Sequence, residues 1–271
     1  FGWNTRLNFN KMWNEVVGFP ANVSEFYISD TWLYANARAS ILGIGSPTTG
    51  IASHGYARNN AGQILINPSS GLPISDGLFK LRGDRNPAFT LGIQNSLRYK
   101  NWRLSFLWDL KIGGDIFNGN EMFLTSIGRS NRTIDRFVPR VIDGVLNDGF
   151  ANTATPTRNT ISVIPAFNDA YYTAAAMPEE AFIQKNVNWL RMRDITLSYS
   201  LNERALRNLN GVKSASIFIT GNDLFLITNY MGADPQVSGN TAATRGVGAF
   251  GFDYGTLATP IGLNFGVRVG F

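Results

Sequence analysis

Aromatic, amide and charged side chains occur along the stretch from residue 113 to residue 186, and their types suit ligand binding. A flat aromatic ring beside hydrogen-bond donors and acceptors is the combination by which proteins hold sugars and peptides. The residues that offer this chemistry, in the stretch or directly after it, are Asn118, Arg129, Arg132, Asp135, Tyr171, Tyr172 and Trp189. We expect them to contact a ligand or a partner; the alternative is a loop that packs on itself.

The residues that build catalytic and metal sites are scarce. The chain has no cysteine and one histidine, His54, so neither thiolate chemistry nor a multi-histidine metal site is available. Two carboxylate pairs, Glu179 with Glu180 and Asp143 with Asp148, lie in loop-like sequence, where we expect a solvated surface. The sequence therefore predicts no enzyme, no metal and no cofactor.

The charge and the hydropathy exclude two further classes. The net charge is +5 and the pI about 9.6, but the 24 Lys and Arg residues are scattered without a basic run, so no nucleic-acid partner is expected. No apolar run approaches the ~18 residues of a transmembrane helix. Strands that cross a membrane alternate in polarity and leave mean hydropathy near neutral, and here it is −0.07.

Six segments alternate between apolar and polar residues, with the period of two that sends successive side chains to opposite faces of a strand. The last is the clearest, because apolar residues occupy every second position from Ile261 to Phe271. Two more strands are expected within residues 31–58. The six segments lie at residues 3–13, 89–99, 102–112, 194–201, 214–222 and 261–271.

The segments run to about ten residues, which suits a tilted strand that crosses a bilayer better than a typical soluble strand. Their second face carries Arg, Asp, Lys, Asn and Gln, as the wall of a wet lumen would. Aromatic residues lie near the strand ends, where interfacial girdles need them: Tyr99, Trp102, Phe117, Tyr199, Phe225 and Phe271. We therefore predict an all-β fold, an antiparallel transmembrane β-barrel to which this chain contributes about six to eight strands.

The connections differ strongly in length. Residues 99–102 and 201–213 are short, whereas residues 113–186 and 228–258 are long. Outer-membrane barrels have short periplasmic turns and long extracellular loops. We therefore expect the short connections on the periplasmic side and the long ones outside the cell.

Two features beside the fourth and fifth segments need their own interpretation. Arg191 and Arg193 fall on the apolar positions of their strand, where a cation facing lipid is costly. Either a β-bulge near Arg193 turns them inward, or they lie above the bilayer beside the loop. In the stretch from Tyr230 to Pro235, Gly232 and the Asp-Pro pair indicate a turn.

Four stretches, in this order, resemble the C-terminal barrel of SusC/RagA-type TonB-dependent transporters: KIGGDIFNG (111–119), RSNRTIDR (129–136), NWLRMRDITLSYSLNERAL (188–206) and SIFITGNDLFLITNYMGADPQVS (216–238). The family pattern also ends on a strand that closes with Phe, here Phe271. The match spans about residues 86–271. Asp84 and Arg85 depart from the family's phrase before its first matching strand. Because alternation begins at residue 1 without an initiator Met, we expect a later part of a longer chain.

The resemblance implies a fold and a function. Such proteins are 22-stranded barrels closed by an N-terminal plug, and residues 1–271 would be the C-terminal part, without the plug. It implies active import of an oligosaccharide or peptide across the outer membrane of a Gram-negative bacterium. The implied partners are a TonB complex acting through the missing N-terminal part, and a SusD-like surface lipoprotein that closes over the barrel. Residues of the 113–186 loop would contact ligand or this lid.

The final strand also resembles the signal that the outer-membrane assembly machinery reads. Its candidate residues share one face of the strand and are Phe271, Val269, Val267 and Phe265. The alternative is a last strand that merely ends on an aromatic residue.

Two other functions remain open from the sequence. The first is a complete small barrel of eight strands with a structural or adhesion role. The second is a soluble β-sandwich that binds glycans. Neither the substrate nor the oligomeric state follows from the sequence.

Overall fold

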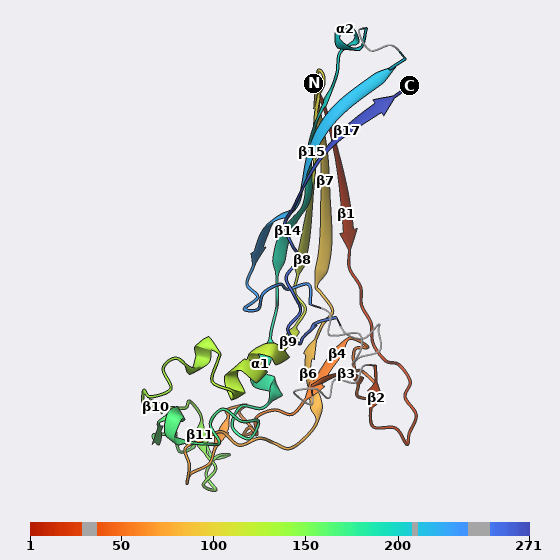
Figure 1. Cartoon of the computed structure of the whole chain (residues 1–271). Coiled ribbons are helices and arrows are strands. Elements are labelled where there is room, and N and C mark those ends of the chain that lie inside the picture. The colour runs from red at the N-terminus through yellow and green to blue at the C-terminus, as the bar shows by residue number, and fades with distance from the viewer. Residues whose placement is uncertain (29–36, 208–210, 238–249) are drawn as a thin grey trace.

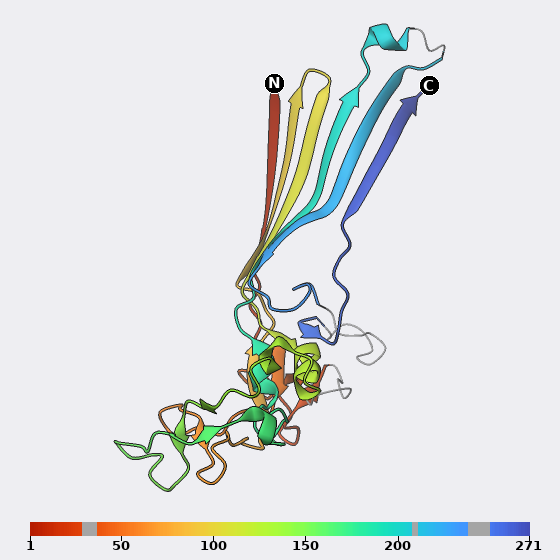
Figure 2. The same ribbon diagram turned by 60° about the vertical axis from the view of Figure 1, so that its left-hand side comes forward.

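The computed structural model describes residues 1–28, 37–207, 211–237 and 250–271. Its central element is one antiparallel sheet of six strands, which we call the wall sheet (Figures 1 and 2). Each wall strand pairs with the next one along the chain, in the order β1-β7-β8-β14-β15-β17. Their bounds are Gly2–Asn10 (β1), Phe89–Tyr99 (β7), Trp102–Ile112 (β8), Trp189–Ser200 (β14), Ser214–Thr228 (β15) and Gly262–Gly270 (β17).

The six alternating segments of the sequence correspond to the six wall strands, which confirms the prediction of an all-β fold. The two further strands expected within residues 31–58 do not join the wall. β3 (Arg38–Ile41) and β4 (Gly50–Ser53) instead belong to a separate four-stranded sheet, and residues 31–36 lie outside the described part of the chain. The wall strands of this chain therefore number six among the described residues.

The wall sheet is open, because β1 and β17 lie at its two edges and do not pair with each other. A complete small barrel would join these edges, so the arrangement does not support that alternative. A β-sandwich would cover the apolar face with a second sheet. Here large apolar side chains of that face remain exposed in the described structure.

The register sorts the side chains of the wall into two faces. One lateral row crosses all six strands and is entirely apolar: Trp3, Leu97, Leu104, Leu197, Ile219 and Phe265. The row beside it lies on the opposite face and is entirely polar: Asn4, Ser96, Ser105, Thr196, Thr220 and Asn264. At the two edges of the apolar row, Trp3 is 69% and Phe265 77% exposed.

One polar residue, Asn95, lies on the apolar face and is matched by its neighbours. Its Oδ1 accepts hydrogen bonds from Trp3 Nε1 at 2.9 Å and from Thr5 Oγ1 at 2.7 Å. Both donors come from the adjacent strand β1, and Asn95 is only 9% exposed. A buried polar group costs free energy unless it is hydrogen-bonded. These two hydrogen bonds therefore offset the cost of placing the Asn95 amide on an apolar face.

A β-bulge at Arg193 confirms the first of the two interpretations of the β14 cations. The register of β14 shifts between Met192 and Asp194 against both neighbouring strands, β8 and β15. The extra residue changes which positions face the polar side, so Arg191 pairs across from Asp109 instead of pointing outward. One inserted residue therefore places two arginines on the polar face.

These two arginines form a network of ion pairs with three carboxylates, which we call the bulge network: Arg191, Arg193, Asp109, Asp223 and Asp234. Arg191 Nη2 lies 2.5 Å from Asp234 Oδ1, and Arg193 Nη2 lies 2.8 Å from Asp109 Oδ2. Arg191 Nη1 also approaches Asp223 Oδ1 at 3.3 Å. Because Arg191 and Asp234 are both nearly fully buried, this pair replaces the water that each charge loses.

Asp234 also fixes the last long connection. Residues 231–233 and 235 are bends, in the stretch where a turn was expected. The Asp234 carboxylate accepts hydrogen bonds from the backbone N–H groups of Gln236 and Thr259. Burial alone would raise the pKa of Asp234, but these two bonds and the Arg191 guanidinium lower it below its ordinary value. The carboxylate is therefore held ionised at the junction of wall and connection.

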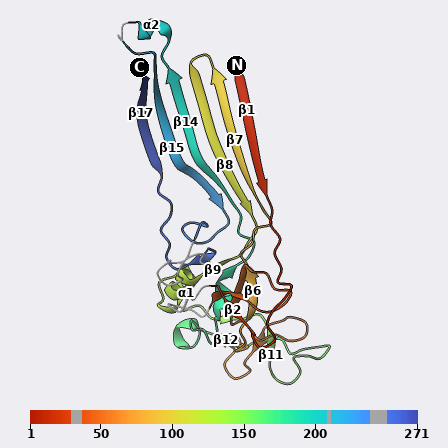
Figure 3. The same ribbon diagram turned by 90° about the vertical axis from the view of Figure 1, so that its right-hand side faces the viewer.

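The connections lie at opposite ends of the wall according to their length (Figures 1 and 3). At one end, the turn end, are the two-residue turn 100–101 and the connection 201–213, which contains α2 (Glu203–Leu206). At the other end are the long connections 113–188 and 229–261. A third long connection, residues 11–88, joins them there, and the sequence interpretation had not assigned it to this end.

The three long connections fold together into what we call the cap. β9 (Ile116–Asn118) pairs with β13 (Ile183–Gln184) and with β16 (Phe252–Asp253), which belongs to the last connection. β11 (Val145–Leu146) pairs in parallel with β5 (Leu65–Ile66) of the first connection. The remaining elements are β2 (Phe26–Tyr27), β6 (Lys80–Asp84), β10 (Arg140–Val141), β12 (Ser162–Val163), α1 (Gly119–Ser126) and three 3-10 helices, at Asn131–Thr133, Pro165–Phe167 and Glu179–Phe182.

Arg85 links the first and last connections inside the cap. Its guanidinium donates to the carbonyl oxygens of Thr49 at 3.0 Å and Phe250 at 2.9 Å, and lies over the Phe250 ring at 4.3 Å. Arg85 is 1% exposed, and this burial lowers its pKa to about 10. Arg85, one of the two residues that depart from the family's sequence pattern, thus stabilises the cap.

The expectation of a solvated surface is wrong for one carboxylate pair. Glu179 is 2% exposed and lies 3.4 Å from His54 Nδ1, and Glu180 pairs with Arg58 at 2.7 Å. These contacts join the first and second connections. A local sequence pattern cannot predict them, because the partners are more than a hundred residues apart. The other pair, Asp143 and Asp148, is exposed as expected.

None of the helices in the described part of the chain has the length and apolar character that crossing a bilayer requires.

Candidate functional site

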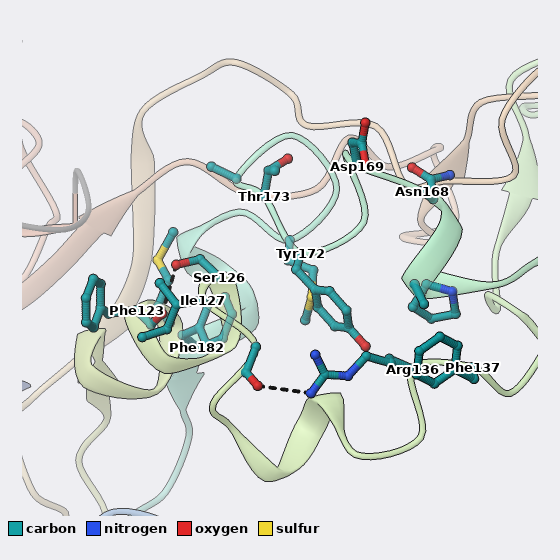
Figure 4. Close-up of a pocket in the computed structure, with 16 residues that line it drawn as sticks. Phe123, Ser126, Ile127, Arg136, Phe137, Asn168, Asp169, Tyr172, Thr173 and Phe182 are labelled. Atoms are coloured by element: carbon teal, nitrogen blue, oxygen red, sulfur yellow. Dashed lines mark hydrogen bonds between the residues drawn. The ribbon is translucent and has the colours of Figure 1, made fainter.

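The cap contains a cavity of about 730 Å3 built from a single connection, residues 113–188 (Figure 4). α1 forms one side, and the segments around residues 136–137 and 165–174 form the other. Aromatic rings, an arginine and an amide–carboxylate pair meet in it. The lining residues with this chemistry are Phe123, Arg136, Phe137, Asn168, Asp169 and Tyr172.

Local hydrogen bonds fix the α1 side of the cavity. Asn118 is the N-cap of α1, and its side chain accepts from the backbone N–H of Glu121 at 2.8 Å. The Glu121 carboxylate in turn accepts from the Ser130 hydroxyl and faces Arg132 Nε at 3.4 Å. Asn118 is buried and engaged in capping, so the helix position, and not a ligand, accounts for its chemistry.

Arg136 is held in place across the cavity floor. Its guanidinium donates to the carbonyl oxygens of Thr133 at 2.8 Å and Gly128 at 3.0 Å. Gly128 has a φ of +71°, a backbone conformation that favours glycine, and a Cβ there would push the Arg136 guanidinium aside. The side chain is therefore oriented before any ligand arrives, and Tyr172 lies next to it (Figure 4).

Tyr172 presents a hydroxyl for which the described residues supply no hydrogen-bond partner. Burial raises the pKa of this phenol above its ordinary value, so the group stays protonated and can donate or accept. A buried hydroxyl without a partner is unfavourable, and a polar atom of a ligand would satisfy it. Tyr172 is thus the predicted site residue with the clearest position in the cavity.

Two other predicted residues, Asp135 and Tyr171, form a cluster with Arg140 beside Tyr172. Asp135 Oδ1 lies 2.8 Å from Arg140 Nη2, and this hydrogen bond lowers the pKa of Asp135. The Arg140 guanidinium lies 5.8 Å from the Tyr171 ring centre, and the Tyr171 and Tyr172 rings meet edge to face at 4.9 Å. Asp135 and Tyr171 therefore support the position of Tyr172 and do not line the cavity themselves.

The remaining predicted residues lie apart from the cavity lining. Arg132 is bound inside the loop, with its guanidinium 5.1 Å from the Phe182 ring. Arg129 is exposed. Trp189 is 6% exposed at the start of β14, where the Arg193 guanidinium lies 5.4 Å from its ring. The structure thus brings Asp135, Tyr171 and Tyr172 together and separates them from Trp189.

Several lining residues were missing from the predicted site. Asn168 and Asp169 sit two to four positions before Tyr171 and Tyr172, so the stretch NDAYY carries the polar and aromatic groups in one short run. Phe137 packs against Phe167 with ring centres 6.1 Å apart. The run could have been singled out from the sequence, whereas the approach of α1 to it is visible only in the fold.

The groups that line the cavity are of the kinds that could bind a ligand. Among the described residues, no cluster of three or more His, Asp or Glu side chains could hold a metal ion. Aromatic rings, oriented donors and an unsatisfied hydroxyl suit a neutral or polar oligomeric ligand.

The fold defines a class of protein. One antiparallel sheet with an apolar outer face, a polar opposite face and all long connections at one end is part of a β-barrel wall of the outer-membrane type. No family model matches the chain. Three TonB-dependent receptors of Formosa agariphila do, and two are informative: P3 is 24% identical over the whole chain and P26 is 25% identical over 70% of it.

Solved structures agree with these relatives. The chain matches the structure of the RagAB peptide transporter over 99% of its length, with a TM-score of 0.62 and 14% identity. The RagAB peptide importer in the open-open state matches with a TM-score of 0.59 and 15% identity. Whole-chain similarity to receptors together with this fold confirms the resemblance to SusC/RagA-type TonB-dependent transporters.

The chain spans a limited part of these proteins. It covers 27% of receptor P3, 17% of receptor P26 and 27% of the matched RagAB chain. The matched relatives are named as receptors and transporters, which agrees with the prediction that the chain is not an enzyme.

Proposed function

We propose that this chain is part of the wall and the outer cap of a TonB-dependent importer in the outer membrane of a Gram-negative bacterium. The imported nutrient is an oligosaccharide or a peptide. The single observation that carries the proposal is the two-faced wall sheet, whose apolar row runs unbroken across all six strands. Such a face needs an apolar solvent, and lipid supplies it.

In this proposal the cap faces the cell exterior and the turn end faces the periplasm. Short turns on the periplasmic side and long loops outside are the pattern of outer-membrane barrels. The polar face then lines the lumen through which the ligand passes. The boundaries of the extracellular part become residues 11–88, 113–188 and 229–261, and the 201–213 connection remains periplasmic.

The cavity at Tyr172 is the proposed outer ligand site. Its rim exposes apolar side chains that nothing in the described chain covers, with Ile127 52%, Phe137 65% and Phe167 77% exposed. A SusD-like surface lipoprotein that closes over the cap would cover this rim and enclose the ligand between the two proteins. The structural neighbour RagAB is named as a peptide transporter, which supports a peptide as one of the two ligand classes.

Two further parts of the proposal concern energy and assembly. A TonB complex would act through an N-terminal part of a longer protein, in keeping with the small share of its relatives that the chain covers. The alternating side chains of β17, with Phe271 after it, would be the signal for insertion. Phe265, Val267, Val269 and Phe271 are all exposed on the apolar side, where an insertion factor could reach them.

The test uses the intact protein in its own bacterium. Membrane fractions locate the protein, and uptake of a labelled peptide pool and of labelled neutral and sulfated oligosaccharide pools is compared between wild type, a deletion strain and Tyr172→Ala. We expect outer-membrane location, loss of uptake of one pool on deletion, and reduced uptake in Tyr172→Ala with normal protein levels. A protein recovered outside the membrane, or a deletion that takes up every pool normally, would contradict the proposal.

A further inference from the structure

Basic residues that are scattered in the sequence gather at the turn end of the wall. Residues 98–103, 200–214 and 266–271 carry seven of the 24 basic residues and one of the 19 acidic residues. Seven cations less one anion leave these segments a formal charge of +6, while the whole chain carries +5. The net positive charge of the chain is therefore concentrated at the turn end of the wall.

Three arginines at this end share the polar face of the wall. Arg98 and Arg103 are directly opposite each other across the β7–β8 pair. Arg268 extends over the Phe218 ring, 5.2 Å from its centre. Phe218 can lie flat there because its partner across the strands is Gly266, where a Cβ would collide with the ring. With Lys100 of the tight turn, these arginines form what we call the turn-end surface.

The turn-end surface lacks acidic partners. None of its four cations forms an ion pair in the described part of the chain, in which the side chain of Glu203 is not included. Like charges directly opposite each other in a sheet are unfavourable. Two adjacent arginines facing one space with no carboxylate are arranged for an anion that comes from outside the described chain.

The surface is a concavity and not a flat patch. It encloses a volume of about 610 Å3, and hydroxyl groups fill the space between the cations. The Thr196 and Thr220 hydroxyls lie 2.8 Å apart and continue the polar row beneath the arginines. The other hydroxyl-bearing lining residues are Ser105, Ser198, Ser200 and Ser216. Guanidinium groups and hydroxyls together bind oxyanions and sugar hydroxyls.

We propose that the turn-end surface binds the anionic groups of the transported ligand, and that this ligand is an oligosaccharide bearing sulfate or carboxylate groups. The assignment rests on the proposed import function. A passage lined by Arg and Lys without counter-charges selects anionic solutes. A peptide suits the lining less well, because the concavity offers no described carboxylate for an amino group and its Phe218 ring is covered by Arg268.

The experiment measures binding to the intact protein purified in detergent, where probes in solution reach its periplasmic side as well as its outer side. The probes are dextran sulfate and uncharged dextran of equal chain length, with polyglutamate as a competitor. The test variant replaces Arg98, Arg103 and Arg268 by Gln. A control variant replaces three exposed arginines outside the concavity, Arg158, Arg204 and Arg207, and so removes the same charge.

We expect wild type to bind dextran sulfate at least tenfold more tightly than dextran, with affinity that falls as salt increases. The test variant should lose at least tenfold in affinity for dextran sulfate, and the control variant less than about threefold. Equal binding of the two dextrans, equal losses in both variants, or polyglutamate that competes as well as dextran sulfate would overturn the assignment.

One more outcome separates an internal partner from a ligand. If the test variant binds dextran sulfate normally but melts at a lower temperature than the control variant, the arginines balance an acidic segment elsewhere in the protein, and the proposal fails. Its failure is distinct from failure of the importer. Uptake of neutral oligosaccharides but not of the sulfated pool would end this inference and leave the import function standing.

Discussion

The arginines at the two ends of the polar face differ in burial and in whether they form ion pairs. At the cap end, Arg191 and Arg193 are matched by three carboxylates, and the Arg191–Asp234 pair is buried. At the turn end, the cations are exposed and none forms an ion pair in the described part of the chain. Arginines thus form ion pairs inside the protein at the cap end and are exposed without such pairs at the turn end.

Burial explains the difference. A charge removed from water needs a partner inside the protein, whereas an exposed charge is hydrated and remains available to a ligand. The network at the bulge joins wall and cap, so its removal should change the structure. The turn-end surface joins nothing in the described chain, so its removal should change binding and leave stability nearly unaltered.

The largest effect should follow Asp234→Ala. This change leaves the Arg191 guanidinium buried without its nearest carboxylate, and it frees the backbone N–H groups of Gln236 and Thr259. Breaking one side of a buried pair costs about 3–5 kcal/mol. Urea unfolding of the detergent-solubilised protein should show this loss, together with faster hydrogen exchange in residues 250–261.

The matched control is Asp143→Ala, because Asp143 and Arg158 form a fully exposed pair at 3.5 Å in the same cap. Exposed pairs contribute about 0–1 kcal/mol. Equal losses in the two variants would contradict the difference between buried and exposed pairs.

The interactions of the Asp234 carboxylate with Arg191 and with the backbone should weaken in acid. The folded-state pKa of Asp234 lies below its ordinary value of 3.8, so its stabilising contribution is complete above about pH 4 and is lost as pH falls through the folded value. Limited proteolysis near residue 259 should therefore be constant from pH 7 to pH 5 and increase toward pH 3. Cleavage that is already faster at pH 5 would point to another group.

A smaller loss is expected for Arg193→Ala. Its pair with Asp109 has side-chain exposures of 26% and 29%, so water screens the attraction in part. We expect a loss of about 1 kcal/mol in the free energy of unfolding, well below that of Asp234→Ala. A double-mutant cycle with Asp109→Ala measures the pair itself, and a coupling near zero would show that the bulge and not the ion pair places Arg193.

The smallest effect, and the opposite sign, is expected at the turn end. Arg103→Glu would place a carboxylate directly opposite Arg98 and turn a like-charge pair into an attractive one. Because both side chains are exposed, the gain should be under about 1 kcal/mol. Arg103→Gln is the control, and a marked loss of stability in Arg103→Glu would mean that Arg103 already has an acidic partner.

The wall was predictable from the sequence because it depends on short-range periodicity. Alternation of apolar and polar residues gave all six strands, and two cations on apolar positions of β14 suggested a bulge near Arg193 as one of two interpretations, which the strand register then confirmed. The turn Lys100–Asn101 was equally visible between two long strands. These features depend on neighbours within a few residues of one another.

The cap was not predictable in the same way. Its strands β5, β9, β11, β13 and β16 have two or three residues each, too few for a period. Two of their pairings, β5 with β11 and β9 with β16, join connections that are far apart in the sequence. For this reason Glu179 was expected in solvent and lies buried beside His54 instead. The gathering of Arg98, Arg103 and Arg268 likewise follows from strand register, which composition does not contain.

The shared sheets of the cap set how its specificity can evolve. β9 lies between β13 of its own connection and β16 of the last one, while β11 pairs with β5 of the first. A foreign loop exchanged into the second connection would bring unmatched strand partners for the other two, and one exchanged into the first or the last would do so for the second. New ligand preferences should therefore arise by small substitutions around the cavity or by inheritance of all three connections together, and single-loop grafts between such proteins should yield chains that do not assemble.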